Sequence, residues 1–483
     1  NFGGSRGVEI FYGANDGTFR AIKGDGGTEL WSFVAPEHHG KLKRLYANTP
    51  PINYPPPSGV VGGQPKDYFF DGSSGLLQNA DNSKVWIFPT MRRGGRMLYA
   101  FDITNTTPSL MWARGCPNMG NDTGCSAGYD GIGQTWSGAN VAFIKGQGPV
   151  TDPTPLIIMG GGYDTCLDTD LAVTTCTNSA KGRKVYVINA ETGAIVGTPF
   201  TTDAPVVADV TLIDRDFDGL VDHAYAADAL GSVYRIDFTD PVTFAPIAWT
   251  MTKIAATTTG NRKFLFGPAA LAVGSNVYLA LGSGDRERPL ITNYPYTTPI
   301  VNRFYSFIDN FSGTTLNLNG ADMENFSAET DCNSVLGVGK RGWYMDLSAG
   351  TGEQTVTSAV IFGGTVFFST NRPTPTVPGS CGTNLGEARG YAVNLLNASG
   401  VIGTGKLCGG QRSGVFTGGG IPPSPVVGVV PITQPDGTTK PTSVLIGGIN
   451  LDTGSGSPIG AQEPKVPIRQ LRTRLYWYPH GDR

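Results

Sequence analysis

Short apolar stretches of strand length recur along the whole chain, and glycine bounds most of them. Clear examples are "PLIIMGGGY", "NVYLALGSGD", "AVIFGGTVFFST" and "SVLIGGIN". Their β-branched residues and their length favour strands over helices. No long segment of helical period is free of glycine and proline. The hydrophobic pattern therefore predicts an all-β protein.

One longer phrase repeats within this pattern: a glycine-rich turn, a strand with a central aromatic residue, and a small polar or acidic residue. It occurs six times, around Phe19, Tyr99, Tyr186, Tyr234, Tyr305 and Tyr391. The irregular spacing fits a core unit that carries loop insertions. Short strands joined by tight turns and repeating every few tens of residues predict a β-propeller, of about seven blades.

The chain is expected to form one propeller domain over residues 1–483. Two stacked β-sandwiches are the alternative, but they would require a linker or a change of composition near the middle, and neither is visible. Three proline-rich stretches are interpreted as insertion loops: Thr49 to Gly59, Asn371 to Ser380, and the run beginning at Pro422.

Composition excludes several classes of function. Only 16% of the residues are charged and the net charge is -3, which offers no basic surface for nucleic acid or anionic lipid. No apolar run is long enough to span a bilayer. The first residues, "NFGGSRGVEI", do not resemble a signal peptide, so we expect this chain to be part of a longer protein.

Seven cysteines indicate an oxidising compartment. Cys116 and Cys125 flank one short loop, and Cys166 and Cys176 flank another, so two local disulfides are expected in preference to free thiols. The spacing required for a zinc site is absent. The partners of Cys332, Cys381 and Cys408 stay open.

The stretch "DRDFDGLVD" is the strongest candidate for a functional site. Asp214, Asp216 and Asp218 occupy its first, third and fifth positions, and Gly219 its sixth. This is the front half of an EF-hand-type calcium loop, in which the odd positions face one centre and glycine allows a sharp turn. Alternating residues precede the stretch and "HAYAAD" follows it, so the loop is expected to connect two strands.

The back half of the stretch departs from an EF-hand. The twelfth position is Tyr225 where an EF-hand has glutamate, so Asp222 is assigned the closing role, together with the backbone carbonyl of Leu220. Hard oxygen ligands on a flexible loop favour Ca²⁺ over Zn²⁺ and Mg²⁺. A solvated acidic turn without an ion is the alternative, although the spacing favours calcium.

The order of these motifs resembles the type IV pilus tip-associated PilC/PilY adhesin family. The resemblance rests on "GANDGTFRAIKGDGGTELWSFVAP", "GGRMLYAFDIT", "GQTWSGANVAFIKG", "DVTLIDRDFDGLVDHAYAADALGSVYRID" and "RGWYMDLS" followed by "GEQTVTSAVIFGGTVFFST". It covers nearly the whole chain, as the C-terminal part of a longer protein. It implies a modified propeller of the quinoprotein-like type with one non-catalytic calcium site, whose ligands match Asp214, Asp216, Asp218, Leu220 and Asp222.

The resemblance also implies a function outside catalysis. Such proteins lie at the pilus tip or on the bacterial outer surface, where they promote pilus assembly against retraction and support twitching motility, adhesion and virulence. The implied partners are pilus-tip and minor pilin subunits, and a host-cell or abiotic surface bound through the region that precedes this chain. No Arg-Gly-Asp tripeptide is present, so integrin binding is not implied.

An enzyme is the alternative. "DGTFRAIKGDGGTELW" also resembles the blade repeat of pyrroloquinoline-quinone dehydrogenases, which use calcium. Those enzymes gather their ligands from several blades and often have a disulfide between adjacent cysteines; here the ligands share one loop and no cysteines are adjacent. The other candidates are weak. "EHH", Glu37 to His39, is interpreted as a solvated loop, and Trp31, Trp136, Trp343 and Trp477 as blade packing.

Overall fold

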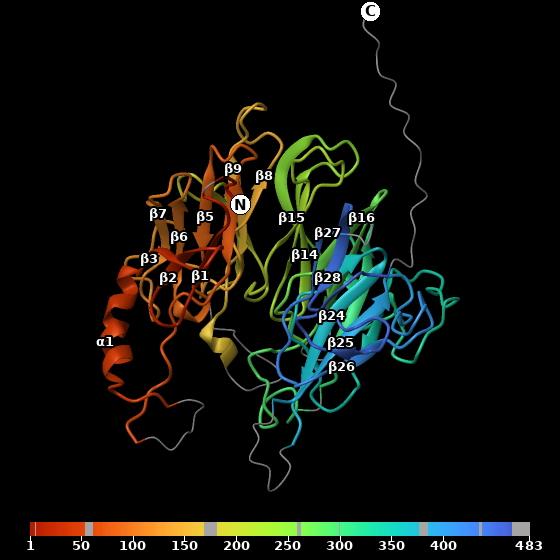
Figure 1. Ribbon diagram of the computed structural model, residues 1–483. Coiled ribbons are helices and arrows are strands. Elements are labelled where there is room, and N and C mark those ends of the chain that lie inside the picture. Colours follow the sequence, from red (N-terminus) through yellow and green to blue (C-terminus); the bar gives the residue numbers. More distant parts are fainter. Residues whose placement is uncertain are drawn as a thin grey trace, which may run out of the picture.

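The computed structural model describes residues 1–4, 6–53, 61–168, 181–257, 262–298, 300–375, 385–433 and 437–465. Within these residues the chain forms seven β-sheets, which follow one another in sequence order around the molecule (Figure 1). The predicted all-β propeller is therefore confirmed. That residues 1–483 form one domain stays a prediction.

The first three sheets take up the N-terminal half of the chain, drawn in red to yellow in Figure 1. The first contains β1 (Glu9–Gly13), β2 (Phe19–Lys23) and β3 (Glu29–Phe33). The second contains β4 (Ser74–Gln78), β5 (Val85–Pro89), β6 (Arg96–Asp102) and β7 (Ser109–Cys116). The third contains β8 (Asn140–Phe143), β9 (Pro155–Gly160), β10 (Lys184–Asn189) and β11 (Phe200–Thr201).

Two five-stranded sheets follow, each with a short parallel strand at its outer side. The fourth contains β12 (Thr211–Ile213), β13 (His223–Ala227), β14 (Ser232–Thr239), β15 (Pro246–Ala256) and β19 (Leu316–Asn317). The fifth contains β16 (Ala269–Val273), β17 (Asn276–Gly282), β18 (Arg303–Asp309), β20 (Met323–Asn325) and β21 (Gly342–Asp346).

The last two sheets lie in the part of the chain drawn in cyan and blue in Figure 1. The sixth contains β22 (Gln354–Thr355), β23 (Val360–Phe362), β24 (Thr365–Arg372), β25 (Glu387–Asn394), β26 (Ser413–Phe416) and β29 (Ser455–Gly456). The seventh contains β27 (Val426–Thr433), β28 (Thr439–Ile446) and β30 (Ala461–Gln462).

Each copy of the repeated aromatic phrase is a strand of a different sheet, namely β2, β6, β10, β14, β18 and β25. In five of these sheets the phrase is the third strand counted from the innermost one, and in the first sheet it is the second. The central aromatic residues are all buried. The repeat is therefore the packing unit of one blade, as the sequence predicts.

Neighbouring sheets pack face to face through separate apolar clusters. The side chains of β6 illustrate the arrangement, because successive residues of a strand point to opposite faces. Tyr99 joins the cluster shared with the first sheet, whereas Leu98 joins the cluster shared with the third. Repetition of this packing arranges the innermost strands β4, β8, β12, β16, β23 and β27 in order around one axis.

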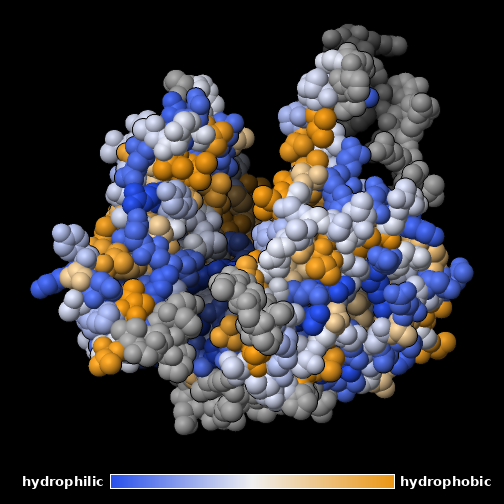
Figure 2. Space-filling model, turned by 60° about the horizontal axis from the view of Figure 1, so that its bottom comes forward, coloured by the Kyte–Doolittle hydropathy of each residue, from blue (hydrophilic) through white to orange (hydrophobic). Residues whose placement is uncertain are grey.

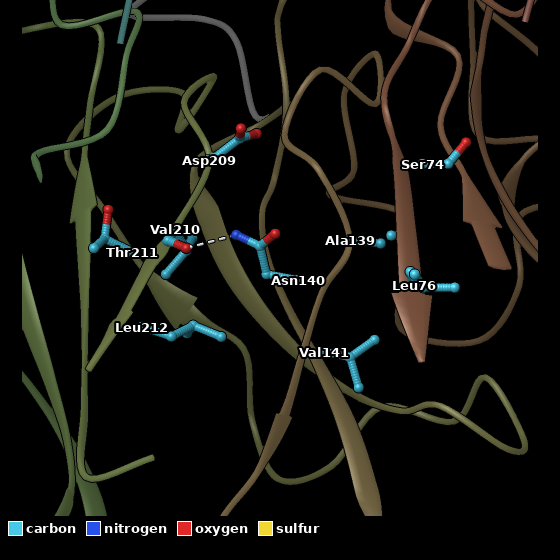
Figure 3. A pocket seen from close by; sticks show the side chains of 10 residues that line it. Ser74, Leu76, Ala139, Asn140, Val141, Asp209, Val210, Thr211 and Leu212 are labelled. Carbon is cyan, nitrogen blue, oxygen red and sulfur yellow. Dashed lines mark hydrogen bonds between the residues drawn. The ribbon is translucent and has the colours of Figure 1, made fainter. Parts of the chain in front are cut away.

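The inner strands are also joined by polar contacts. Figure 3 shows β4, β8 and the start of β12 around a shallow pocket. There the Asn140 side-chain amide donates a hydrogen bond of 2.8 Å to the carbonyl of Val210 (Figure 3). The surface of the molecule has a notch between two lobes, and hydrophobic residues border it (Figure 2).

Two sequence interpretations are corrected. The proline-rich run beginning at Pro422 contains β27, the innermost strand of the seventh sheet, because its valines pair with β28 despite the flanking prolines. "EHH" is not a solvated loop. It spans a 3-10 helix (Pro36–His38) and the start of α1 (His39–Ala47), and His38 is buried with Nε2 3.0 Å from the carbonyl of Gly94.

Two further 3-10 helices complete the described secondary structure, η2 (Arg92–Gly94) and η3 (Thr165–Asp168). None of the described helices has both the length and the hydrophobicity that crossing a membrane requires.

Two disulfides are present among the described residues. Cys116–Cys125 closes the short loop predicted from the sequence, which confirms that pairing. Cys332–Cys408 joins positions 76 residues apart and resolves one pairing left open by the sequence. Cys176 and Cys381 lie outside the described residues, as does Trp477. The predicted Cys166–Cys176 bond therefore stays a prediction.

Candidate metal centre

The acidic stretch 214–222 connects two neighbouring strands of the fourth sheet. β12 ends at Ile213 and β13 begins at His223. The backbone N–H of Asp222 donates to the carbonyl of Ile213 at 2.9 Å, which closes the loop at its base. The predicted strand-to-strand connection is confirmed.

Three of the four predicted aspartates converge within this loop. Carboxylate oxygens of Asp214, Asp216 and Asp218 all lie within 4.8 Å of one another. The turn that brings them together has left-handed backbone at Phe217 (φ 61°) and at Gly219 (φ 88°). Such values favour glycine, which explains why a glycine is needed at the sixth position of the loop.

Backbone amides hold the three carboxylates in place. Asp214 accepts hydrogen bonds from the N–H of Phe217 at 2.7 Å and of Gly219 at 2.8 Å. The N–H of Leu220 donates to Oδ1 of Asp218 at 2.9 Å. The loop therefore curls around its own acidic side chains, and the odd-numbered positions face one point.

Asp222 has a different environment. Its side chain is fully buried. Oδ2 accepts the N–H of Arg215 at 2.8 Å, and Oδ1 accepts the hydroxyl of Thr239 on β14 at 2.9 Å. Asp222 thus ties the loop to the sheet, and its place in the ligand set, like that of the Leu220 carbonyl, stays a prediction.

Lys145 supplies a positive charge to the cluster from the neighbouring sheet. It lies just after β8, and its Nζ is 2.7 Å from Oδ2 of Asp218 and 3.3 Å from Oδ2 of Asp216. The N–H of Val221 also donates to the carbonyl of Phe143 at 2.7 Å. The acidic loop is therefore in contact with the third sheet through two residues near the end of β8. Lys145 was not among the residues predicted for the site, since nothing in the local sequence relates it to a loop 71 residues away.

The contact between Lys145 and Asp218 shifts the pKa values of both groups in the direction expected of an ion pair. The hydrogen bond from Lys145 lowers the pKa of Asp218, and the hydrogen bond to Asp218 raises the pKa of Lys145. Both side chains are near the surface, so the pair itself adds little to stability. The pair matters because the ammonium occupies a position next to the carboxylates that are predicted to bind a cation.

A buried polar network supports the base of the loop. The Arg215 guanidinium lies 4.2 Å from the ring centre of Phe311 and donates to the carbonyl of Pro241 at 2.9 Å. Beside it, Asp237 accepts from Arg235 at 2.7 Å and contacts Nδ1 of His223 at 2.8 Å. These contacts fix the strands from which the loop projects, so the acidic cluster stands on a rigid base.

The three carboxylates fit a divalent cation that prefers oxygen. All three side chains offer hard oxygen ligands, the preference of Ca²⁺. Among the described residues, one other group has metal-ligand spacing, Cys116, Asp122 and Cys125, but its two sulfurs are joined in a disulfide. The loop at 214–222 is therefore the better candidate metal centre.

Comparison with known proteins decides the family. The model of the PilY1 beta-propeller domain matches residues 4–245, which include the acidic loop and half of the chain. The chain belongs to the PilY1 beta-propeller family. The resemblance noted from the sequence motifs is thereby confirmed.

Curated relatives of this family member are longer than the chain. A type IV pilus biogenesis factor PilY1 homolog of Xylella fastidiosa is 24% identical over 92% of this chain and 34% of its own length. Type IV pilus biogenesis factor PilY1 of Pseudomonas aeruginosa is 25% identical over 48% of this chain and 17% of its own length. The chain thus spans about a third of the first relative and less of the second.

A solved structure supports the fold. The crystal structure of the Pseudomonas aeruginosa PilY1 C-terminal domain superposes with a TM-score of 0.60, at 16% sequence identity and over 91% of each chain. At this identity the likeness concerns the architecture of the propeller alone.

Proposed function

We propose that this chain is the calcium-binding propeller of a type IV pilus biogenesis factor on the bacterial surface. Ca²⁺ would be held by Asp214, Asp216 and Asp218, with the Leu220 carbonyl and Asp222 as further predicted ligands. Family membership and the names of the relatives support the pilus role. The observation that carries the calcium assignment is the convergence of the three carboxylates within 4.8 Å.

Bound Ca²⁺ would supply two positive charges to the carboxylates that Lys145 now contacts. The ion and the ammonium compete for oxygens of Asp216 and Asp218. Occupancy would therefore free the Lys145 side chain and alter the contact between the third and fourth sheets. We propose that this change regulates pilus extension against retraction, and thereby twitching motility and adhesion.

The proposed partners and location follow from the pilus role. Pilus-tip and minor pilin subunits are the proposed partners, and the pilus tip or outer surface is the proposed location. A surface ligand would be bound through regions outside this chain. The Cys116–Cys125 and Cys332–Cys408 disulfides support an oxidising, extracytoplasmic location.

The cellular experiment replaces the gene with one that encodes Asp218→Asn, which keeps the size of the side chain but removes its charge. Asp240→Asn is a matched control, because Asp240 lies in an exposed turn of the same sheet and caps it through Val242 and Thr243. We expect Asp218→Asn to lose surface pili or twitching and Asp240→Asn to keep both. Normal piliation and motility in a variant shown to bind no calcium would contradict the regulatory role.

We propose, further, that the chain has no dehydrogenase activity. Its candidate calcium ligands share one loop, unlike the dispersed ligands of quinoprotein enzymes. Adding pyrroloquinoline quinone with Ca²⁺ should give neither a bound-quinone absorption band nor dye-linked alcohol oxidation. Oxidation at stoichiometric cofactor would establish the enzyme alternative.

A further inference from the structure

Segments from six sheets meet at a small cavity on the propeller axis. Its volume is about 160 Å³. Six of its lining residues come just before the innermost strand of the second to seventh sheets: Ser73, Trp136, Asp209, Phe266, Ser358 and Ser424. The cavity is therefore shared by six of the seven sheets.

Two arginines also line this cavity, Arg92 from η2 and Arg286 from the segment after β17. Among the described residues, neither guanidinium makes an ion pair or a hydrogen bond, and Nε of Arg92 is buried without a partner. Burial and the positive charge of Arg92 lower the pKa of Arg286, and the negative charges of Glu287 and Asp71 offset this only in part. Two like charges thus face one small cavity at a cost in stability.

Neighbouring cations at the same end of the axis are neutralised. Arg93 pairs with Asp168 at 3.0 Å and with Glu287 at 2.9 Å. The buried ammonium of Lys263 pairs with Asp285 at 2.6 Å. Arg92 and Arg286 are thus unusual in their own surroundings, although each is adjacent in sequence to a paired residue.

The backbone at Arg92 gives independent support. Its φ is 45°, in the left-handed region that a side chain with Cβ rarely adopts. Backbone strain of this kind is concentrated at functional sites. The turn places the Arg92 guanidinium 5.5 Å from the ring centre of Trp136. The ring thus holds the cation at the cavity wall without neutralising it.

One acidic side chain lines the cavity. Asp209 accepts the N–H of Gly138 at 2.6 Å and makes no ion pair with either arginine among the described residues. Serines supply the remaining polar groups, and Oγ of Ser424 accepts the N–H of Ser358 at 3.0 Å. The lining therefore carries two positive charges, one negative charge and hydroxyl groups.

We propose that the axial cavity binds a small anion with several oxygens, a carboxylate or a phosphate, between Arg92 and Arg286. Guanidinium groups recognise such anions through paired hydrogen bonds. The hydroxyls of Ser73, Ser358 and Ser424 also line the cavity and can donate hydrogen bonds to the oxygens of such an anion. The site is separate from the acidic loop and binds the opposite charge.

Calorimetric titration with inorganic phosphate and with citrate, at constant ionic strength, tests the site. We expect at least one anion to bind the wild type, and the tighter of the two identifies the class. Arg92→Gln and Arg286→Gln should each weaken binding about tenfold or more, the equivalent of one charge-assisted hydrogen bond. Arg389→Gln is the matched control, since Arg389 pairs with Glu387 on β25, and should bind as the wild type does.

A second measurement tests the proposal even if the glutamine variants fold poorly. Arg286→Lys keeps the charge and loses the planar fork, so it should stay folded by circular dichroism and bind with intermediate affinity. Low concentrations of the bound anion should raise the melting temperature of the wild type more than that of Arg286→Lys. No binding of either anion to the wild type, or equal affinity in Arg286→Gln and wild type, would overturn the proposal.

Discussion

The ammonium of Lys145 lies 2.7 Å from Oδ2 of Asp218, so a cation from one blade contacts the carboxylate cluster of the next. The same ammonium reaches Asp216 at 3.3 Å. A loop built to bind a divalent cation would have this lysine as its built-in competitor. If the loop binds calcium as proposed, this contact would link calcium affinity to the packing of two neighbouring blades.

Removing that competitor should strengthen calcium binding. Each unit charge a few ångströms away contributes on the order of 1 kcal/mol near the surface. Lys145→Gln should therefore lower the calcium dissociation constant about five- to tenfold by calorimetry. Lys253→Gln is the control, because Lys253 on β15 of the same sheet pairs with Asp203, which is not part of the acidic loop. An unchanged dissociation constant in Lys145→Gln would show that the ammonium does not compete.

The two described disulfides should differ in their contribution to stability. Cys332–Cys408 encloses a long segment, with a sequence separation of 76, whereas Cys116–Cys125 has a separation of 9. In the chain-entropy model the longer loop stabilises by roughly 4.5 kcal/mol and the shorter by roughly 2.5 kcal/mol. Paired Cys→Ser replacements, compared by urea unfolding, should show the larger loss for Cys332 and Cys408. The reverse order would mean that native-state packing outweighs chain entropy.

Asp228 should make stability depend on pH. Burial raises the pKa of this carboxyl to about 6, although the N–H of Ser232 and the Tyr234 hydroxyl donate to it. The folded state therefore binds the proton more tightly than the unfolded state. The contribution of protonated Asp228 to stability is complete at pH values below the pKa that this carboxyl has in the unfolded chain. It is lost as the pH rises through about 6.

Asp228→Asn should remove this dependence, since its amide is neutral at every pH. The free energy of unfolding of the wild type, minus that of the variant, should fall by about 3 kcal/mol between acidic and neutral pH. Urea unfolding of both proteins at a series of pH values measures the difference. A difference that does not change with pH would contradict the assignment.

Much of the fold follows from local sequence. The aromatic phrases around Tyr99 and Tyr234 predict strands because each is a short run rich in apolar and aromatic residues that follows a glycine-containing turn. The structure has them as β6 and β14. β27 was not predicted, because prolines on both sides of its valines resemble a loop, and its pairing with β28 depends on tertiary contacts. α1 was missed because it has no buried face to give it a hydrophobic period.

The candidate metal site was predictable only in part. Asp214, Asp216 and Asp218 are close in sequence, so their spacing alone indicates that they converge. Asp222 has the same chemistry, yet the hydroxyl of Thr239 and the N–H of Arg215 hold its carboxylate. No local pattern predicts the positions of Lys145, Arg92 and Arg286, because these residues lie beside groups that belong to other blades. Trp136 was expected to serve in blade packing, but it also lines the axial cavity.

Asp218 is the best position at which to test the calcium assignment. It is near the surface, whereas Asp222 is fully buried and supports the base of the loop. Replacing Asp218 therefore changes the ligand set and leaves the buried network intact. Circular dichroism should show the same fold in Asp218→Asn as in the wild type.

The decisive measurement is a calorimetric calcium titration of the wild type, Asp218→Asn and the Asp240→Asn control. Losing one charged ligand should weaken binding about tenfold or more, because hydrogen bonds and contacts to a charged group contribute roughly 1.5–3 kcal/mol. The account predicts one calcium ion per chain in the wild type and the control, and much weaker binding in Asp218→Asn. Equal calcium affinity in all three proteins, or no binding to the wild type, would contradict it.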